Sequence, residues 1–423
     1  MVPEEEKMKL QPACLEKVAR LIEKGVRIPN PLTLDIGDEV RLDQISGDRV
    51  AIYPGCRIYG EGTVISAGAR IGQEGPVTID NCRIGPKVEL KGGYFSRSVF
   101  LEGASMGLGA QVREACILEE EASGAHCVGL KHTILFPFVT LGSLINFCDC
   151  LMAGGTSRQN HSEVGSSYIH FNFTPDGDKT TPSLIGDVPR GVMLREPPIF
   201  LGGHGGIVGP LRVGYGNVTA AGSILRRDYP EGNKLILGKA PVGGVRGFVP
   251  KAYVGFSHIV KSNILYLANL TALEEWYRWV RKDFLESQEF GPLMHDGLME
   301  ALSAAKRERL KRLQAMAEKA HASTSSRAGA QHVEAKRELH EKMALIEEIF
   351  MDKAAEDRTA MDREQFLADF SRSTEGKATG YIQAIQALPA DARAKGVRWL
   401  DQVVATLCVK VAGAISSLRS LGE

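Results

Sequence analysis

Apolar residues recur at every sixth position along much of the first half of this chain. The main series is Ile52, Ile58, Val64, Val88, Tyr94, Phe100, Met106, Val112, Leu118, Leu130 and Phe136. A shorter series, one residue later, is Ile65, Ile71 and Val77. A helix has a period near 3.6 and an ordinary strand a period near 2, so a period of six fits neither. It predicts hexapeptide repeats, in which each hexad is one short strand and three hexads close a coil of about 18 residues.

Glycine follows many of these hexads, as the tight corners of such a coil require. Examples are Gly55, Gly60, Gly62, Gly68, Gly72 and Gly85. Glycine adopts positive φ without steric cost, which suits it to a corner between two short strands. The repeat therefore predicts a parallel β-helix, although the period alone does not determine its handedness.

Helical spacing replaces the six-residue repeat at both ends of the chain. Residues 13–25 form an amphipathic pattern that ends at Gly25. From Asn263 onward, apolar residues are spaced at helical intervals and glycine becomes rare. Further helices are expected at 298–320, 331–357, 361–371 and 391–419, with a polar linker at 321–330. The predicted organisation is a helix and lead-in over 1–49, a β-helix over 50–249 and an α-helical region over 250–423.

The first helix of the C-terminal region carries an apolar stripe. Its members are Leu265, Leu267, Leu270, Leu273, Trp276 and Val280. Burying one large apolar side chain contributes roughly 1.5–3 kcal/mol, so a lone helix does not leave such a stripe in water. We expect this helix to pack on the end or flank of the β-helix, with the later helices packed on it.

Composition excludes several classes of function. The 51 Lys and Arg residues balance the 51 Asp and Glu residues, which argues against nucleic acid or an anionic membrane as the main partner. No apolar run approaches the ~18 residues of a membrane span, and the N-terminal residues lack the apolar part of a signal peptide. We therefore expect a cytoplasmic protein without a membrane span.

The eight cysteines are scattered and include no CxxC pair, so neither disulfides nor a metal site is predicted. Cys148 and Cys150 lie two positions apart on an expected strand, where both sulfurs would face the same way. Two ligands are too few for a structural zinc ion.

Three motifs between Arg158 and Lys239 carry a resemblance to a known family. They are Asn160-His161, the stretch VGSSYIHFNF ending in Asn172-Phe173, and VTAAGSILRRDYPEG from Val218. The chain resembles the acetyltransferase half of the bifunctional enzymes that make UDP-N-acetylglucosamine from glucosamine-1-phosphate. This resemblance implies a left-handed β-helix, a homotrimer, and acetyl-CoA as co-substrate in the groove between subunits. It also implies acyl transfer to a sugar phosphate or a nucleotide sugar.

The resemblance assigns roles to residues of these motifs. His161 is the implied general base, because the attacking amine must be neutral and a histidine can take its proton near neutral pH. Asn172 is the implied donor to the thioester carbonyl, where it would stabilise the developing oxyanion. The implied contacts to acetyl-CoA are Phe173, Gly203, Ala220, Ala221, Arg226 and Lys239. The implied contacts to the acceptor are Arg158, Asn160 and Lys179.

One departure from the family concerns the position of the base. The family has about two-thirds of a coil between its Asn-His pair and the stretch that ends in Asn-Tyr. Here only Ser162 and Glu163 separate His161 from Val164. A deletion of that size predicts that His161 moves to a different corner of the β-helix. Either the coil is rebuilt, or the role of base passes to His170 or His204.

Other departures keep two alternative functions open. The family's lysine after the Asn146-Phe147 pair is replaced near Leu151, and the expected arginines two coils earlier are absent, with Lys131 and His132 nearest. These losses favour a non-catalytic β-helix scaffold or a nucleotide-sugar-binding protein. Only about 50 residues precede the first clear hexad, too few for the family's pyrophosphorylase domain, so uridylyl transfer is not expected.

Overall fold

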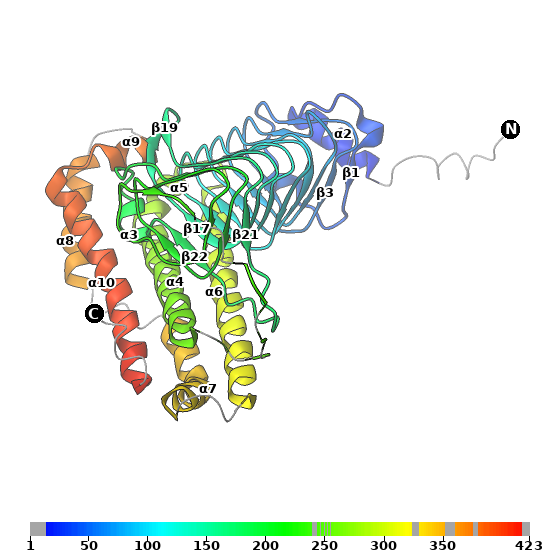
Figure 1. The fold of residues 1–423 in the computed structure, drawn as a ribbon. Coiled ribbons are helices and arrows are strands. Elements are labelled where there is room, and N and C mark those ends of the chain that lie inside the picture. The colour runs from blue at the N-terminus through cyan, green and yellow to red at the C-terminus, as the bar shows by residue number, and fades with distance from the viewer. Residues whose placement is uncertain are drawn as a thin grey trace.

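The protein is a left-handed parallel β-helix with a layer of α-helices along one side (Figure 1). The computed structural model describes residues 14–238, 243–245, 247–248, 250–251, 253, 255–323, 330–351, 360–374 and 380–416. Each coil of the β-helix contributes one short strand to each of three faces, and equivalent strands of successive coils pair in parallel.

The first face consists of β1 (Asp35–Ile36), β3 (Arg57–Tyr59), β6 (Val77–Asp80), β9 (Gly93–Ser96), β12 (Ala110–Arg113), the first parts of β15 (Gly129–Leu135) and β17 (Asn146–Met152), β21 (Ile169–Phe171), β24 (Gly206–Val208) and β27 (Ile224–Leu225). The second face consists of β4 (Val64–Ile65), β7 (Arg83–Ile84), β10 (Val99–Phe100), β13 (Ile117–Leu118), the later parts of β15 and β17, β22 (Ser183–Ile185) and β25 (Arg212–Val213). The third face consists of β2 (Ala51–Ile52), β5 (Arg70–Ile71), β8 (Glu89–Leu90), β11 (Ser105–Met106), β14 (Ser123–Gly124), β16 (Thr140–Leu141), β20 (Glu163–Val164), β23 (Phe200–Leu201), β26 (Val218–Thr219) and β28 (Leu235–Ile236). We call the edge between the first and second faces the first corner, that between the second and third faces the second corner, and that between the third and first faces the third corner.

The six-residue period is explained by the side chains that fill the interior of the coils. Ile58, Ile84 and Leu90, one from each face, are fully buried. Tyr94 is the exception in the main series: it is half-exposed on the first face, and Phe95 fills the core. Phe95 pairs in register with Ile79 of the preceding coil. The inward-facing residue of β9 therefore lies one position later than the six-residue period predicts.

Two strands bend around the first corner without a break. In β17 the bend falls at Asp149, which has a φ of 57°. Cys148 therefore belongs to the first face and Cys150 to the second. The expectation that both sulfurs face the same way is wrong, because it assumed a straight strand.

The helices are α2 (Leu15–Lys24), α3 (Val188–Gly191), α4 (Phe256–Trp276), α5 (Lys282–Glu286), α6 (Gly291–Ala322), α7 (Ala330–Met351), α8 (Ala360–Thr374), α9 (Tyr381–Gln386) and α10 (Ala390–Ala414). The short helices η1 (Pro31–Thr33) and η2 (Leu42–Gln44) precede the first regular coils, and the π-helical turn η3 (Tyr277–Arg281) joins α4 to α5. No helix in these described segments is long and apolar enough to cross a membrane.

The helical layer covers the second face, so its first helix packs on the flank of the β-helix, one of the two positions that its apolar stripe predicted. Helices α4 and α6 contact strands of that face, α10 packs on α4, and α7 packs on α6 (Figure 1). Trp276 of the stripe is fully buried. Its ring lies 6.4 Å from Trp399 of α10, and its indole N–H donates to the hydroxyl of Tyr381 at 2.9 Å.

Helix α6 runs alongside the coils, and its rise along the axis matches the spacing between successive coils. Near its start, the backbone at Gly297 leaves no room for a side chain: a Cβ atom there would lie 2.4 Å from Cγ of Arg83 on β7. Arg309, twelve residues later, reaches Asp149 on β17, four coils further on. Twelve helical residues rise about 18 Å, and four strand spacings span about 19 Å. The helix can therefore contact successive coils without bending away.

A buried polar cluster anchors the helical layer at the second corner. Glu119, just after β13, accepts a hydrogen bond from the hydroxyl of Tyr277, and the adjacent Glu120 forms two hydrogen bonds with Arg281. The guanidinium of Arg281 also stacks over the ring of Tyr381 at 3.7 Å. Burial raises the pKa of Glu119 to about 7; Arg281 opposes this shift and Glu120 adds to it.

We predict that this cluster makes stability depend on pH. The pKa of Glu119 is higher in the folded state than its ordinary value of 4.5. Between these two pKa values the folded protein binds more protons than the unfolded chain. The contribution of Glu119 to the free energy of unfolding therefore falls as pH rises. Glu119→Gln should remove a dependence on the order of 2 kcal/mol between pH 4.5 and 7, measured by chemical denaturation. Glu102→Gln, on an exposed carboxylate, is the control; equal pH profiles for the wild type and Glu119→Gln would contradict the prediction.

Candidate functional site

Charged and polar side chains form a column along the first corner. Asn81, Arg97, Glu114, His132 and Asp149 occupy equivalent positions in successive coils, and all have positive φ, between 43° and 57°. The last four recur at spacings of 17 or 18 residues, which is one coil. The side chains at this corner therefore form a row of guanidinium, carboxylate and imidazole groups beside α6.

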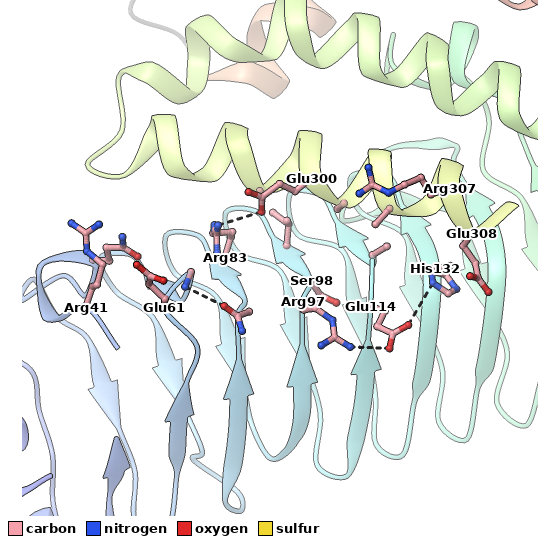
Figure 2. Close-up of a pocket in the computed structure, with 18 of the residues that line it drawn as sticks. Arg41, Glu61, Arg83, Arg97, Ser98, Glu114, His132, Glu300, Arg307 and Glu308 are labelled. Atoms are coloured by element: carbon pink, nitrogen blue, oxygen red, sulfur yellow. Dashed lines mark hydrogen bonds and ion pairs between the residues drawn. The ribbon is translucent and has the colours of Figure 1, made fainter. Parts of the chain in front are cut away.

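A groove of about 750 Å³ lies between this column and α6 (Figure 2). Its lining includes Arg83, Arg97, Ser98, Glu114 and His132 from the coils and Glu300, Arg307, Glu308 and Lys311 from α6. Arg83 pairs with Glu300 at 3.4 Å, and Arg97 pairs with Glu114 at 2.8 Å. The groove therefore presents both signs of charge along its length.

A buried charge cluster lies beyond His132, at the end of the groove. Asp149 and Arg309 form an ion pair of 2.9 Å, with side chains 3% and 2% exposed. Nδ1 of His132 lies 3.3 Å from the same carboxylate. Burial opposes ionisation of Asp149, but Arg309 and His132 overcome this effect and lower its pKa. Asp149 is therefore a buried carboxylate held ionised by two partners.

The other ring nitrogen of His132 faces the groove. Nε2 lies 3.8 Å from a carboxylate oxygen of Glu114, which is too far for a hydrogen bond. Lys131 and Arg97 overcome the partial burial of Glu114 and lower its pKa, so this carboxylate is also ionised. The negative charge of Asp149 favours a proton on Nδ1, which leaves the lone pair of Nε2 available to a ligand.

The loop that contains Asn172, Phe173 and Lys179 lies at the same corner, one coil beyond Asp149. Arg309 donates a hydrogen bond to the carbonyl oxygen of Lys179 at 2.9 Å. The Lys179 ammonium lies 5.4 Å from the centre of the Phe173 ring, which is 84% exposed. Asn172 is half-buried. One arginine of α6 thus links the groove to this loop.

The other described residues assigned to acetyl-CoA lie on either side of the first face in the late coils. Gly203, Ala220 and Ala221 lie at the third corner, and Arg226 is exposed at the first corner, after β27. Lys239 lies outside the described residues. The face between these two corners exposes the apolar side chains of Ile169, Phe171 and Val208.

His161 lies at the second corner, away from Asn172. It belongs to an antiparallel hairpin formed by β18 (Gly155–Ser157) and β19 (Asn160–His161), which departs from the coil path (Figure 1). Nδ1 of His161 is 2.8 Å from the carbonyl oxygen of Arg158, and Asn160 donates to Thr156. The Arg158 guanidinium bonds to two backbone carbonyls and to Thr140 of the neighbouring coils.

Of the two alternative bases, His170 is buried in the interior, where Nε2 lies 2.8 Å from Oγ of Ser183 and burial lowers the pKa to about 4. His204 is exposed at the third corner.

The structure therefore distributes the predicted site residues over three corners of one chain. It brings together Asn172, Phe173, Lys179 and Arg226 at the first corner, and Gly203, Ala220 and Ala221 at the third. The groove and its Asp149–Arg309 pair were not identified from the sequence. The spacing of Arg97, Glu114, His132 and Asp149 was the available signal, because it equals one coil.

No family model matches this chain. It is 28% identical to the bifunctional protein GlmU of Thermotoga maritima over 246 residues, 56% of this chain and 47% of that protein. It is 29% identical to the bifunctional protein GlmU of Thermosipho melanesiensis over 234 residues and to that of Fervidobacterium nodosum over 238 residues. The chain spans about half the length of these curated relatives. Its β-helix with the motifs at Asn160-His161, Asn172-Phe173 and Val218 fits the acetyltransferase domain that the sequence suggested, and the chain is similar to the GlmU proteins over slightly more than half its length.

Proposed function

We propose that this protein is a GlmU-like acyltransferase that uses acetyl-CoA to acylate a sugar phosphate or a nucleotide sugar. The observation that carries the proposal is the late-coil surface of the first face. Its two flanking corners hold the described residues that were assigned to acetyl-CoA, and its exposed apolar side chains offer a wall for the pantetheine arm. Small residues at the third corner leave backbone amides accessible to a ligand.

In this proposal, the first corner supplies the hydrogen-bond donor to the thioester carbonyl and a contact to the CoA phosphates. Asn172 would donate to the thioester carbonyl, and Phe173 would cover the acyl group. Arg226, which is exposed, would bind the CoA phosphates together with Lys239 from outside the described residues. Lys179 would contact the acceptor.

Within this proposal, His161 acts as base only across a subunit boundary. His161 and Asn172 lie at different corners of one chain, so a neighbouring copy must bring its hairpin to the first face. The helical layer covers the second face, which leaves the first and third faces for a homotrimer. The third face also exposes Phe200, Val218 and Leu235 in its late coils, which such an assembly would bury.

A nucleotide-sugar-binding protein without transfer activity is the second candidate. Leu151 is fully buried where the family has a lysine for the sugar phosphate. Arg158, an expected acceptor contact, is instead bonded to backbone carbonyls. Binding of acetyl-CoA distinguishes the acyltransferase from this candidate and from a scaffold.

The first test is stabilisation by acetyl-CoA. A ligand at 100 times its Kd adds about 2.7 kcal/mol to the free energy of unfolding, which thermal denaturation detects easily. Ala221→Trp should abolish the shift, because the indole would occupy the third corner of the late coils. Leu108→Trp, at the same corner in an earlier coil and also exposed, should keep it. If millimolar acetyl-CoA leaves the melting temperature of the wild type unchanged, the proposed function is wrong.

The second test concerns His161. If a neighbouring copy supplies this base, His161→Ala should lower turnover of acetyl-CoA with glucosamine-1-phosphate about 10²–10⁴-fold and leave the melting temperature unchanged. Thiol release measures the rate, and light scattering after gel filtration measures the assembly. A monomer with full activity would exclude His161 from the reaction.

A further inference from the structure

The loop that contains Asn172 and Phe173 continues into residues 176–180, which two helices of the helical layer hold in place. We call these residues the held segment. Three of its backbone carbonyl oxygens accept hydrogen bonds from side chains of α4 and α6. We propose that Lys319 of α6 is a positioning residue for acetyl-CoA, because it fixes the held segment and thereby the places of Phe173 and Lys179. The inference rests on the proposed acyl transfer and assigns a residue outside the β-helix that acts through this loop.

The helices bind the held segment through its backbone. The ammonium of Lys319 donates a hydrogen bond to the carbonyl oxygen of Asp176 at 2.6 Å. The side-chain amide of Asn263 on α4 donates to the carbonyl oxygen of Thr180 at 3.2 Å, and Arg309 bonds to a third carbonyl. Backbone carbonyl groups that are removed from water need such partners, so each contact favours one conformation of the segment.

The ammonium of Lys319 is directed at the loop and not at a carboxylate. Among the residues that the structure describes, the ion pairs of α6 do not include Lys319. A Cβ atom at Gly177 would lie 3.9 Å from the Lys319 nitrogen. Asp176 is held a second time, because the backbone N–H of Lys251 donates to its carboxylate at 3.0 Å. Asp176 is therefore fixed both at its carbonyl group and at its side chain.

The held segment determines where the Lys179 side chain lies. Lys179 has a φ of 59°, in the left-handed region that is uncommon for residues other than glycine. A residue stays in such a region where the surrounding contacts fix it. From this backbone the Lys179 ammonium reaches the exposed ring of Phe173. The contacts to the held segment thus extend to the two side chains proposed to meet the acyl group and the acceptor.

A loop that is fixed before its ligand arrives loses less conformational freedom when the ligand binds. Release of Asp176 would let Phe173 and Lys179 occupy other positions, and acetyl-CoA would bind only the fraction of molecules with the competent loop. The apparent affinity falls by that fraction. Asn172 directly follows β21, so its place depends less on the held segment. Loss of Lys319 should therefore raise KM for acetyl-CoA and leave kcat nearly unchanged.

Hydrogen exchange on the full chain tests whether Lys319 fixes the loop. Lys319→Met removes the ammonium and keeps a long side chain. The amides of Gly177 and Lys179, which bond within the loop, should then exchange about tenfold faster. Lys319→Arg should restore slow exchange, and Lys342→Met, an exposed lysine on α7, is the control. Unchanged exchange in Lys319→Met overturns the proposal.

A purely structural role for Lys319 gives a different result. Lys319 lies in the last turn of α6, where a cation also interacts favourably with the helix dipole. If this interaction were its whole contribution, Lys319→Met would lower the melting temperature without faster exchange confined to the loop.

Calorimetry and kinetics with acetyl-CoA test whether the fixed loop matters for binding. In Lys319→Met, Kd and KM for acetyl-CoA should rise about tenfold, the loss of one charge-assisted hydrogen bond, and Lys319→Arg should return both to the wild-type values. If the loop amides exchange faster while Kd and KM stay the same, the positioning role is wrong although the acyltransferase stands. If the wild type does not bind acetyl-CoA, the proposed function is wrong and the positioning role fails with it, whereas the exchange rates still decide whether Lys319 holds the loop.

Discussion

The ion pair between Asp149 and Arg309 is the contact on which the rest of the arrangement depends. Both side chains are almost fully buried, and removing one partner would leave an uncompensated charge in the interior. The pair joins a corner of the β-helix to the middle of α6. It also fixes His132 on one side and the carbonyl of Lys179 on the other. One buried pair therefore holds the helix, closes the groove and orders the loop that contains Asn172.

The spacing of the coils of the β-helix matches the rise of α6, and this match makes the contact possible. A parallel β-helix places equivalent residues at a constant spacing along its axis, and an α-helix laid along it rises at its own constant rate. From Arg83 to Asp149 on the coils and from Gly297 to Arg309 on α6, the two distances nearly agree. A straight helix can thus bury its charged and small residues against several coils. The groove lies where Arg97, Ser98 and Glu114 stay apart from the helix.

The helical layer also constrains how copies of this chain could assemble. It covers the second face and is anchored at the second corner by Glu119, Tyr277 and Arg281. The late coils of the first and third faces stay accessible and expose apolar side chains. These are the surfaces on which the proposed acetyl-CoA site lies. The layer thus leaves the late coils of the first and third faces free for the proposed acetyl-CoA site.

The sequence by itself determined the β-helix and the helices that follow it. Each hexad needs only its own inward residue, as Ile58 and Leu90 show, so the pattern is local and readable. The apolar stripe through Trp276 could be identified in the same way, because it depends only on the spacing of residues within one helix. Only the tertiary structure decided which face the helices cover and that Arg309 meets Asp149, because those residues are far apart in the chain. It also decided that His161 lies on a hairpin away from Asn172, since the missing part of a coil was replaced by chain whose path no periodicity describes.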